Sequence, residues 1–179
     1  MKSVYFVRHG QTVWNVENKI CGATDIELTA LGHEQAIETG KKILEKKIEA
    51  DVILYSPLMR AKDTALHISE ITGIPAKEEM RLKEQNFGKY ESTPRHGEEF
   101  EEAKKSFINH FDGGESMFEM AQRIYNLLDD LKKESGEKTY LLVAHNGISR
   151  VVNSYFHDMT NEEYAVFGIK NCEILKYEF

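Results

Sequence analysis

The sequence predicts an α/β fold, a three-layer α/β/α sandwich with a mainly parallel central sheet. Runs of β-branched and aromatic residues, typical of buried strands, occur at 4–7, 51–55 and 139–144. Between them lie segments in which apolar residues recur at helical spacing. Strands that alternate with helices in this way are typical of βαβ units and of a parallel sheet. At 179 residues we expect a single domain over 1–179, with a lid-like excursion at about 85–115.

Two helices are predicted in the first half of the chain. Thr29 has the side chain of an N-cap, and the helix after it would run to about Lys47. The apolar stripe of this helix comprises Leu31, Ala36, Gly40, Ile43, Leu44 and Ile48. Ser56 as N-cap and Pro57 at the first helical position predict the start of the second helix, which Gly73 would end.

In the second half, a short strand is expected at 74–80. Residues 116–119 form a capping-box sequence that opens a long helix. The apolar face of that helix comprises Met117, Met120, Ala121, Ile124, Leu127, Leu128 and Leu131. A further helix is predicted at about 148–156, and a second capping box occurs at 160–163. The stretch 172–177 has the composition of an edge strand.

Charge and cysteine content narrow the function classes. A formal charge of −7 argues against general affinity for nucleic acid or for an anionic membrane surface, so neither is expected as a partner. No apolar run approaches the roughly 20 residues that span a bilayer, and no signal-peptide core is found. Cys21 and Cys172 have no zinc-site or disulfide spacing, which fits a reducing compartment and predicts a cytoplasmic location. The sequence leaves the oligomeric state open.

Polar side chains that suit phosphate follow three of the predicted strands. Arg8 and His9 end the first strand, Arg60 lies about one helical turn after the second, and His145 ends the strand at 139–144. If these strands are parallel neighbours, the side chains meet at one edge of the sheet, where ligands of α/β proteins bind. An arginine guanidinium can donate two parallel hydrogen bonds to phosphate. Taken alone, the Arg8-His9 pair is also compatible with a simple turn cap.

Six motifs, in order along nearly the whole chain, resemble those of the histidine phosphatase superfamily, which includes the cofactor-dependent phosphoglycerate mutases. They are Arg8-His9-Gly10-Gln11-Thr12 with Asn15, Cys21-Gly22 through Gln35-Ala36, Tyr55-Ser56-Pro57-Leu58-Met59-Arg60-Ala61 with Thr64-Ala65, Leu82-Lys83-Glu84 with Phe87-Gly88-Lys89-Tyr90-Glu91, Gly113-Gly114-Glu115-Ser116, and Val143-Ala144-His145-Asn146-Gly147.

The resemblance implies a double displacement through phosphohistidine. His9 would attack phosphorus as a neutral ring, because an imidazolium has no lone pair to offer. Arg8, Arg60 and His145 would bind the non-bridging oxygens, and Glu84 would act as general acid and then as general base. The residues that the resemblance places around the substrate are Arg8, Asn15, Cys21, Gly22, Arg60, Glu84, His145 and Asn146. Neither a metal nor a cofactor is expected, and the expected partner is a small phosphorylated metabolite.

Departures from the family pattern bear on the substrate. The mutases of the family have a longer, lysine-bearing insert after the acid segment and a paired arginine, which this chain lacks in clear form. This difference favours a phosphatase over a phosphoglycerate mutase, which remains the alternative. Cys21 and Asn146 stand where the family more often has a polar residue and a glycine. A phosphate-binding regulatory protein without turnover is a second alternative. We expect 85–115 to contain the residues that select the metabolite.

Overall fold

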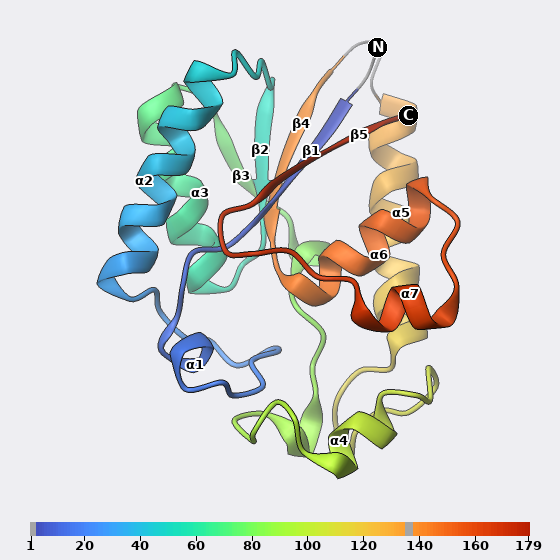
Figure 1. The fold of residues 1–179 in the computed structure, drawn as a ribbon. Coiled ribbons are helices and arrows are strands. Elements are labelled where there is room, and N and C mark those ends of the chain that lie inside the picture. Colours follow the sequence, from blue (N-terminus) through green and yellow to red (C-terminus); the bar gives the residue numbers. More distant parts are fainter. Residues whose placement is uncertain (1–2, 135–137) are drawn as a thin grey trace.

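A computed structural model describes residues 3–134 and 138–179. At its centre is a five-stranded sheet in the order β3-β2-β4-β1-β5, with helices on both faces (Figure 1). Only β5 runs antiparallel to its neighbour, so the predicted three-layer architecture with a mainly parallel sheet is confirmed. The strands are β1 (Ser3–Arg8), β2 (Val52–Tyr55), β3 (Ala76–Glu78), β4 (Tyr140–Ala144) and β5 (Ile174–Glu178).

The register of the three inner strands decides where the polar strand ends meet. β4 lies between β1 and β2, and all five of its residues are buried, as expected for a strand covered on both faces. Arg8 pairs with Ala144 across one side of β4, and Tyr55 pairs with Val143 across the other. The carboxyl ends of β1, β4 and β2 therefore lie level at one edge of the sheet.

Helices α2 (Ala30–Glu45) and α3 (Met59–Thr72) cover one face of the sheet (Figure 1). They pack closely because Gly40 has no side chain: a Cβ there would lie 3.0 Å from atoms of Ile71. Thr29 caps α2 as predicted, with its hydroxyl accepting from Gly32 N at 3.0 Å. The core of this face comprises Val7, Ile43, Ile53, Ala61, Ala65, Ile68, Leu141 and Val143.

The predicted apolar stripe of α2 is partly wrong. Leu31 and Leu44 are 47% and 52% exposed, respectively. The inward face instead follows the residues Gly32, Ala36, Thr39, Gly40 and Ile43. Leu31 and Leu44 each neighbour an inward residue, and one step along a helix turns a side chain about 100° away from that direction. Small residues carry most of this face, since they permit the close approach to α3.

The start of α3 also differs from the prediction that Ser56 caps it and Pro57 is its first residue. The helix begins at Met59, and the N-cap position is held by Leu58 without a side-chain cap. Residues 56–58 form a turn, and the backbone N–H of Met59 donates to Asp25 Oδ1 at 2.7 Å. A carboxylate distant in sequence thus satisfies the helix terminus, and the Ser56 hydroxyl is free to contact another group.

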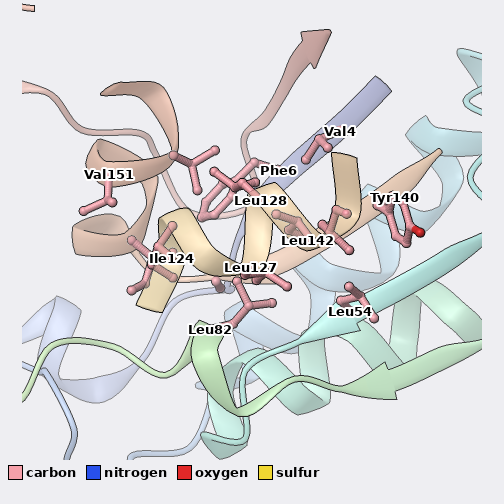
Figure 2. Close-up of a cluster of buried hydrophobic side chains, with 14 of the residues drawn as sticks. Val4, Phe6, Leu54, Leu82, Ile124, Leu127, Leu128, Tyr140, Leu142 and Val151 are labelled. Carbon is pink, nitrogen blue, oxygen red and sulfur yellow. The ribbon is translucent and has the colours of Figure 1, made fainter. Parts of the chain in front are cut away.

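The opposite face is covered by α5 (Met117–Glu134), α6 (Asn146–Phe156) and α7 (Asn161–Val166). Figure 2 shows Ile124, Leu127 and Leu128 of α5 packed over Phe6 and Leu142 of the sheet. The predicted capping box of α5 is present, with Ser116 N donating to Glu119 Oε2 and Glu119 N to Ser116 Oγ. Helix α6 begins two residues earlier than predicted, directly after β4.

Irregular segments cover the carboxyl edge of the sheet (Figure 1). One contains α1 (Val13–Val16); the other follows β3 and contains η1 (Met80–Leu82), η2 (Gly88–Tyr90) and α4 (Glu98–Ala103). A small separate core joins them, made of Ile20, Tyr90, Phe100 and Phe111. No helix in the described ranges is both long and apolar enough to cross a membrane.

Candidate active site

A cavity of about 440 Å³ opens at the carboxyl edge of the sheet. Six of the candidate residues line it: Arg8, His9, Asn15, Cys21, Glu84 and Asn146. Arg60 and His145 do not line it and are fully buried, but the charge of Arg60 acts on His9, and the rings of His9 and His145 have centroids 5.2 Å apart. The convergence expected from the strand ends is therefore observed.

The hydrogen bond of His9 determines which ring nitrogen can react. Its Nδ1 lies 2.7 Å from the carbonyl oxygen of Gly10, which can only accept, so Nδ1 carries the proton. Nε2 is then left with its lone pair. Burial, reinforced by the charges of Arg60 and Arg8, holds the pKa of His9 well below its usual range. The imidazole is neutral at neutral pH, which is the form a nucleophile requires.

A serine contacts the imidazole of His145. Nε2 of His145 lies 2.6 Å from Ser56 Oγ, and Ser56 Oγ accepts the backbone N–H of Leu58 at 3.3 Å. Burial, with the charge of Arg60 next, lowers the pKa of His145 well below its usual range, so this ring is also neutral. Ser56 Oγ already accepts from Leu58, so its own proton can be donated to Nε2, which would place the ring proton on Nδ1.

The two arginines are held by backbone carbonyls. Arg8 Nη1 donates to Ile169 O at 2.6 Å, whereas Arg60 donates from Nη1 to Thr24 O at 2.8 Å and from Nη2 to Gly22 O at 2.7 Å. Burial first, and the charge of a neighbouring arginine second, lowers the pKa of Arg8 to about 10, so it stays charged at neutral pH. Two fixed cations therefore flank the buried imidazoles.

Three buried side-chain polar atoms in the described part of the chain lack a hydrogen-bond partner, and all belong to this site. They are Nε of Arg8, Nε of Arg60 and Nδ1 of His145. Buried donors are almost always paired in native proteins, and leaving one unpaired costs about 1–3 kcal/mol. Three such donors beside one cavity make an anion with several acceptor oxygens the ligand that would satisfy the site.

Glu84 is a buried carboxylate that lines the same cavity. Its Oε1 accepts from Gln85 N and its Oε2 from Gly147 N, both at 2.9 Å. Burial raises the pKa of the Glu84 carboxyl, against the two N–H donors that favour its charged form. Gly147 is required for this contact, since a Cβ at that position would lie 2.4 Å from Glu84 Oε1.

Of the neighbouring residues Gly22 and Cys21, only Cys21 lines the cavity. Gly22 is not among the residues that line the cavity: its carbonyl holds Arg60, and its N–H donates to Glu91 Oε2 at 3.0 Å. Cys21 does line the cavity, and burial raises the pKa of its thiol to about 11. The thiol is therefore protonated at neutral pH and has no nucleophilic character there.

Residues 167–172 form a segment, here called the C-terminal strap, that donates hydrogen bonds to residues of the site. The sequence pattern does not predict this role. Asn171 Nδ2 donates to His9 O at 2.9 Å and to Asn15 Oδ1 at 3.3 Å. The backbone N–H of Ile169 donates to Asn146 Oδ1 at 2.9 Å. Since both asparagine oxygens accept from the protein, the amide nitrogens are the atoms that Asn15 and Asn146 can offer to a ligand.

Across residues 3–134 and 138–179, no group of three or more His, Cys, Asp or Glu side chains is arranged to hold a metal ion. Arg8 and Arg60 are the cations whose charges act most strongly on the imidazole of His9.

The sheet is mainly parallel, and two arginines and two neutral imidazoles lie at its carboxyl edge. These features are typical of an α/β protein that binds an anion. The chain belongs to the histidine phosphatase superfamily (branch 1), whose family model matches residues 4–179. The resemblance stated from the motifs is thereby confirmed.

Relatives of the chain include both phosphatases and mutases. The uncharacterized phosphatase PhoE of Bacillus subtilis (strain 168) is 37% identical over 145 residues, which cover 81% of this chain and 72% of that protein. A 2,3-bisphosphoglycerate-dependent phosphoglycerate mutase of Chelativorans sp. (strain BNC1) is 33% identical over 179 residues, covering 93% and 87%. Among solved structures, a mycobacterial glucosyl-3-phosphoglycerate phosphatase has a TM-score of 0.83 and 25% identity, covering 98% of this chain and 89% of that one.

Proposed function

We propose that this protein is a phosphomonoesterase that hydrolyses a small phosphorylated metabolite through a phosphohistidine intermediate on His9. One observation carries the proposal: Arg8, Arg60 and His145, each with a side-chain nitrogen that has no partner, lie close to His9, which lines the cavity and keeps its lone pair on Nε2. A phosphoryl group has three non-bridging oxygens to accept from these donors and a phosphorus atom for the imidazole to attack.

In the first step, the lone pair of His9 Nε2 forms the N–P bond and the ester P–O bond breaks. Arg8, Arg60 and His145 donate to the non-bridging oxygens as their charge redistributes. Glu84 gives its proton to the leaving alcohol oxygen, and burial, which raises the pKa of this carboxyl, favours the protonated form that the step requires. The alcohol leaves while Glu84 is ionised and His9 carries the phosphoryl group.

In the second step, the Glu84 carboxylate accepts a proton from a water molecule, whose oxygen attacks phosphorus. The N–P bond breaks, inorganic phosphate leaves, and His9 Nε2 recovers its lone pair. Each group ends in its starting protonation state, so the cycle needs no other reactant. The proposal assigns charge neutralisation to Arg8 and Arg60 and includes neither a metal nor a cofactor.

We propose the small phosphorylated metabolite as the partner, and neither nucleic acid nor a membrane. The formal charge of −7 supports this, because such surfaces are polyanionic. Cys21 and Cys172 are both free thiols, which supports a cytoplasmic location.

The second candidate function is a phosphoglycerate mutase, favoured by the full-length similarity to the Chelativorans protein. The short segment after the acid residue favours hydrolysis. Incubation of purified protein with 3-phosphoglycerate separates the two: release of inorganic phosphate supports the phosphatase, whereas formation of 2-phosphoglycerate supports the mutase. Both would form phosphohistidine, so trapping an intermediate alone does not discriminate between them.

The proposed nucleophile is tested by rapid acid-free quenching with a 32P-labelled ester, followed by mapping of the acid-labile, base-stable phosphopeptide. We expect label on the peptide that contains His9, and none in His9→Asn. The matched control is His96→Asn, because His96 lines the same cavity but is largely exposed. Label in His9→Asn would refute the assignment, and a failure to hydrolyse any ester in a broad panel would favour a binding protein without turnover.

A further inference from the structure

Two arginines that line the cavity take no part in the proposed reaction. Arg95, between η2 and α4, and Arg150 of α6 both line the cavity that contains His9 and Arg8. Both are half-buried, and they come from segments 55 residues apart in sequence. Their positive charges act on Arg8, whose pKa they help to lower.

Neither arginine is neutralised by the protein. In the described part of the chain, no carboxylate lies within ion-pair distance of Arg95 or Arg150. Arg95 donates to the backbone carbonyl of Lys19 at 3.3 Å, and Arg150 donates to that of Phe167 at 2.7 Å. Lys104, which also lines the cavity, differs because it is paired with Glu101 at 3.1 Å.

Clustered cations are costly in a half-buried cavity unless an anion joins them. One phosphoryl group accounts for the donors of Arg8, Arg60 and His145. Arg95 and Arg150 therefore remain for a different anion, and a cavity of about 440 Å³ has room for both groups on one small molecule. The cavity is therefore locally positive in a protein whose formal charge is −7.

We propose that the substrate carries a second anionic group, a carboxylate or a second phosphate, which Arg95 and Arg150 bind while its ester phosphate lies at His9. The inference rests on the proposed function and deepens it, since it names the substrate class. Esters of neutral alcohols such as simple sugars would lack this second contact and would be poor substrates.

Matched pairs of esters test the inference. O-phosphoserine and O-phosphoethanolamine differ by one carboxylate, and fructose 1,6-bisphosphate and fructose 6-phosphate differ by one phosphate. We expect kcat/KM for the member with the additional anion to exceed that for its partner by about tenfold to a hundredfold in at least one pair. The pair that shows the preference identifies which anion is bound.

The variants Arg95→Gln and Arg150→Gln should reduce that preference about tenfold or more, and Lys105→Gln should leave it unchanged. Lys105 is a suitable control because it is largely exposed, bonded to Glu102 and outside the cavity. The readout is a ratio between two esters, so a general loss of active protein cancels. Arg150→Met, which also removes the charge, serves if Arg150→Gln does not fold. Equal kcat/KM within both pairs, or a preference that survives both arginine variants, would overturn the inference while leaving ester hydrolysis intact. Hydrolysis of no ester would instead refute the proposed function itself.

Discussion

The hydroxyl of Ser56 lies 2.6 Å from Nε2 of His145, although the two residues are 89 positions apart in the chain. The sheet brings them together. Ser56 extends the pairing of β2 with β4 by donating its N–H to Val143 O at 3.1 Å, two residues before His145. The serine is fully buried, so its contact with the imidazole is sheltered from water. We infer that Ser56 donates this hydrogen bond, which places the ring proton of His145 on Nδ1, the nitrogen without a partner.

Replacing Ser56 with alanine should therefore reduce kcat roughly tenfold, with a smaller effect on KM, since the preference for the Nδ1–H tautomer is lost. The decisive measurement is the 15N chemical shift of both ring nitrogens of His145. We expect an Nδ1–H pattern in the wild type and a mixture of tautomers in Ser56→Ala. Ser69→Ala is the control, because that hydroxyl donates to Ile74 O far from the cavity. An unchanged tautomer in Ser56→Ala would contradict the role.

The depressed pKa values of His9 and His145 predict a pH-dependent stability. Each ring is neutral in the folded state but gains a proton near pH 6.5 when unfolded, so the unfolded state binds more protons below that pH. The stability contributed by each histidine is complete above pH 6.5 and is lost as the pH falls, by up to about 1.4 kcal/mol per pH unit. Urea unfolding of the wild type and of His145→Asn at pH 7.5 and 5.5 measures the difference.

The decrease in the free energy of unfolding between these pH values should be smaller in His145→Asn than in the wild type. Glu84 acts in the opposite direction, because its raised pKa makes the folded state bind more protons as the pH falls. Its contribution is shared by both proteins and cancels in the comparison. Parallel pH profiles for the two proteins would show that His145 does not stay neutral in the folded state.

Replacing Glu84 with glutamine should affect substrates according to their leaving group. Alkyl phosphates need a proton on the departing oxygen, so their turnover should fall about 10²–10⁴-fold. p-Nitrophenyl phosphate releases a stable anion and should lose much less. Single-turnover rates with both ester types provide the comparison, and Glu101→Gln is the control because Glu101 lines the same cavity. Equal losses for the two ester types would remove Glu84 from the role of general acid.

Local sequence was sufficient to predict the strands and the residues at their carboxyl ends. Apolar runs mark β1, β2 and β4, and once these strands are parallel neighbours, Arg8, His9 and His145 must lie at the same edge. The capping boxes at 116–119 and 160–163 were likewise predictable, since both partners are three residues apart.

What could not be predicted depends on partners that are distant in sequence. Asp25 moves the start of α3 to Met59, and Asn171 of the strap positions His9 across 162 residues. Arg150 lies on α6 without any local feature that distinguishes it from a surface arginine. Only the packing of α6 against the sheet shows that its side chain lines the cavity.

The close approach of Gly147 to Glu84 leads to a test of the site in which no candidate catalytic residue is replaced. In Gly147→Ala, the added Cβ would lie 2.4 Å from Glu84 Oε1 and 3.0 Å from Cδ, closer than real contacts permit, so the carboxylate must move. We expect the variant to reproduce the leaving-group pattern of Glu84→Gln, with alkyl phosphates slowed far more than p-nitrophenyl phosphate. Overpacking should also lower the free energy of unfolding by about 1–3 kcal/mol. The control is Gly97→Ala, where a Cβ would meet only Pro94 O at 3.6 Å. Full activity of Gly147→Ala toward alkyl phosphates would mean that proton transfer does not depend on the position of Glu84 beside this backbone N–H.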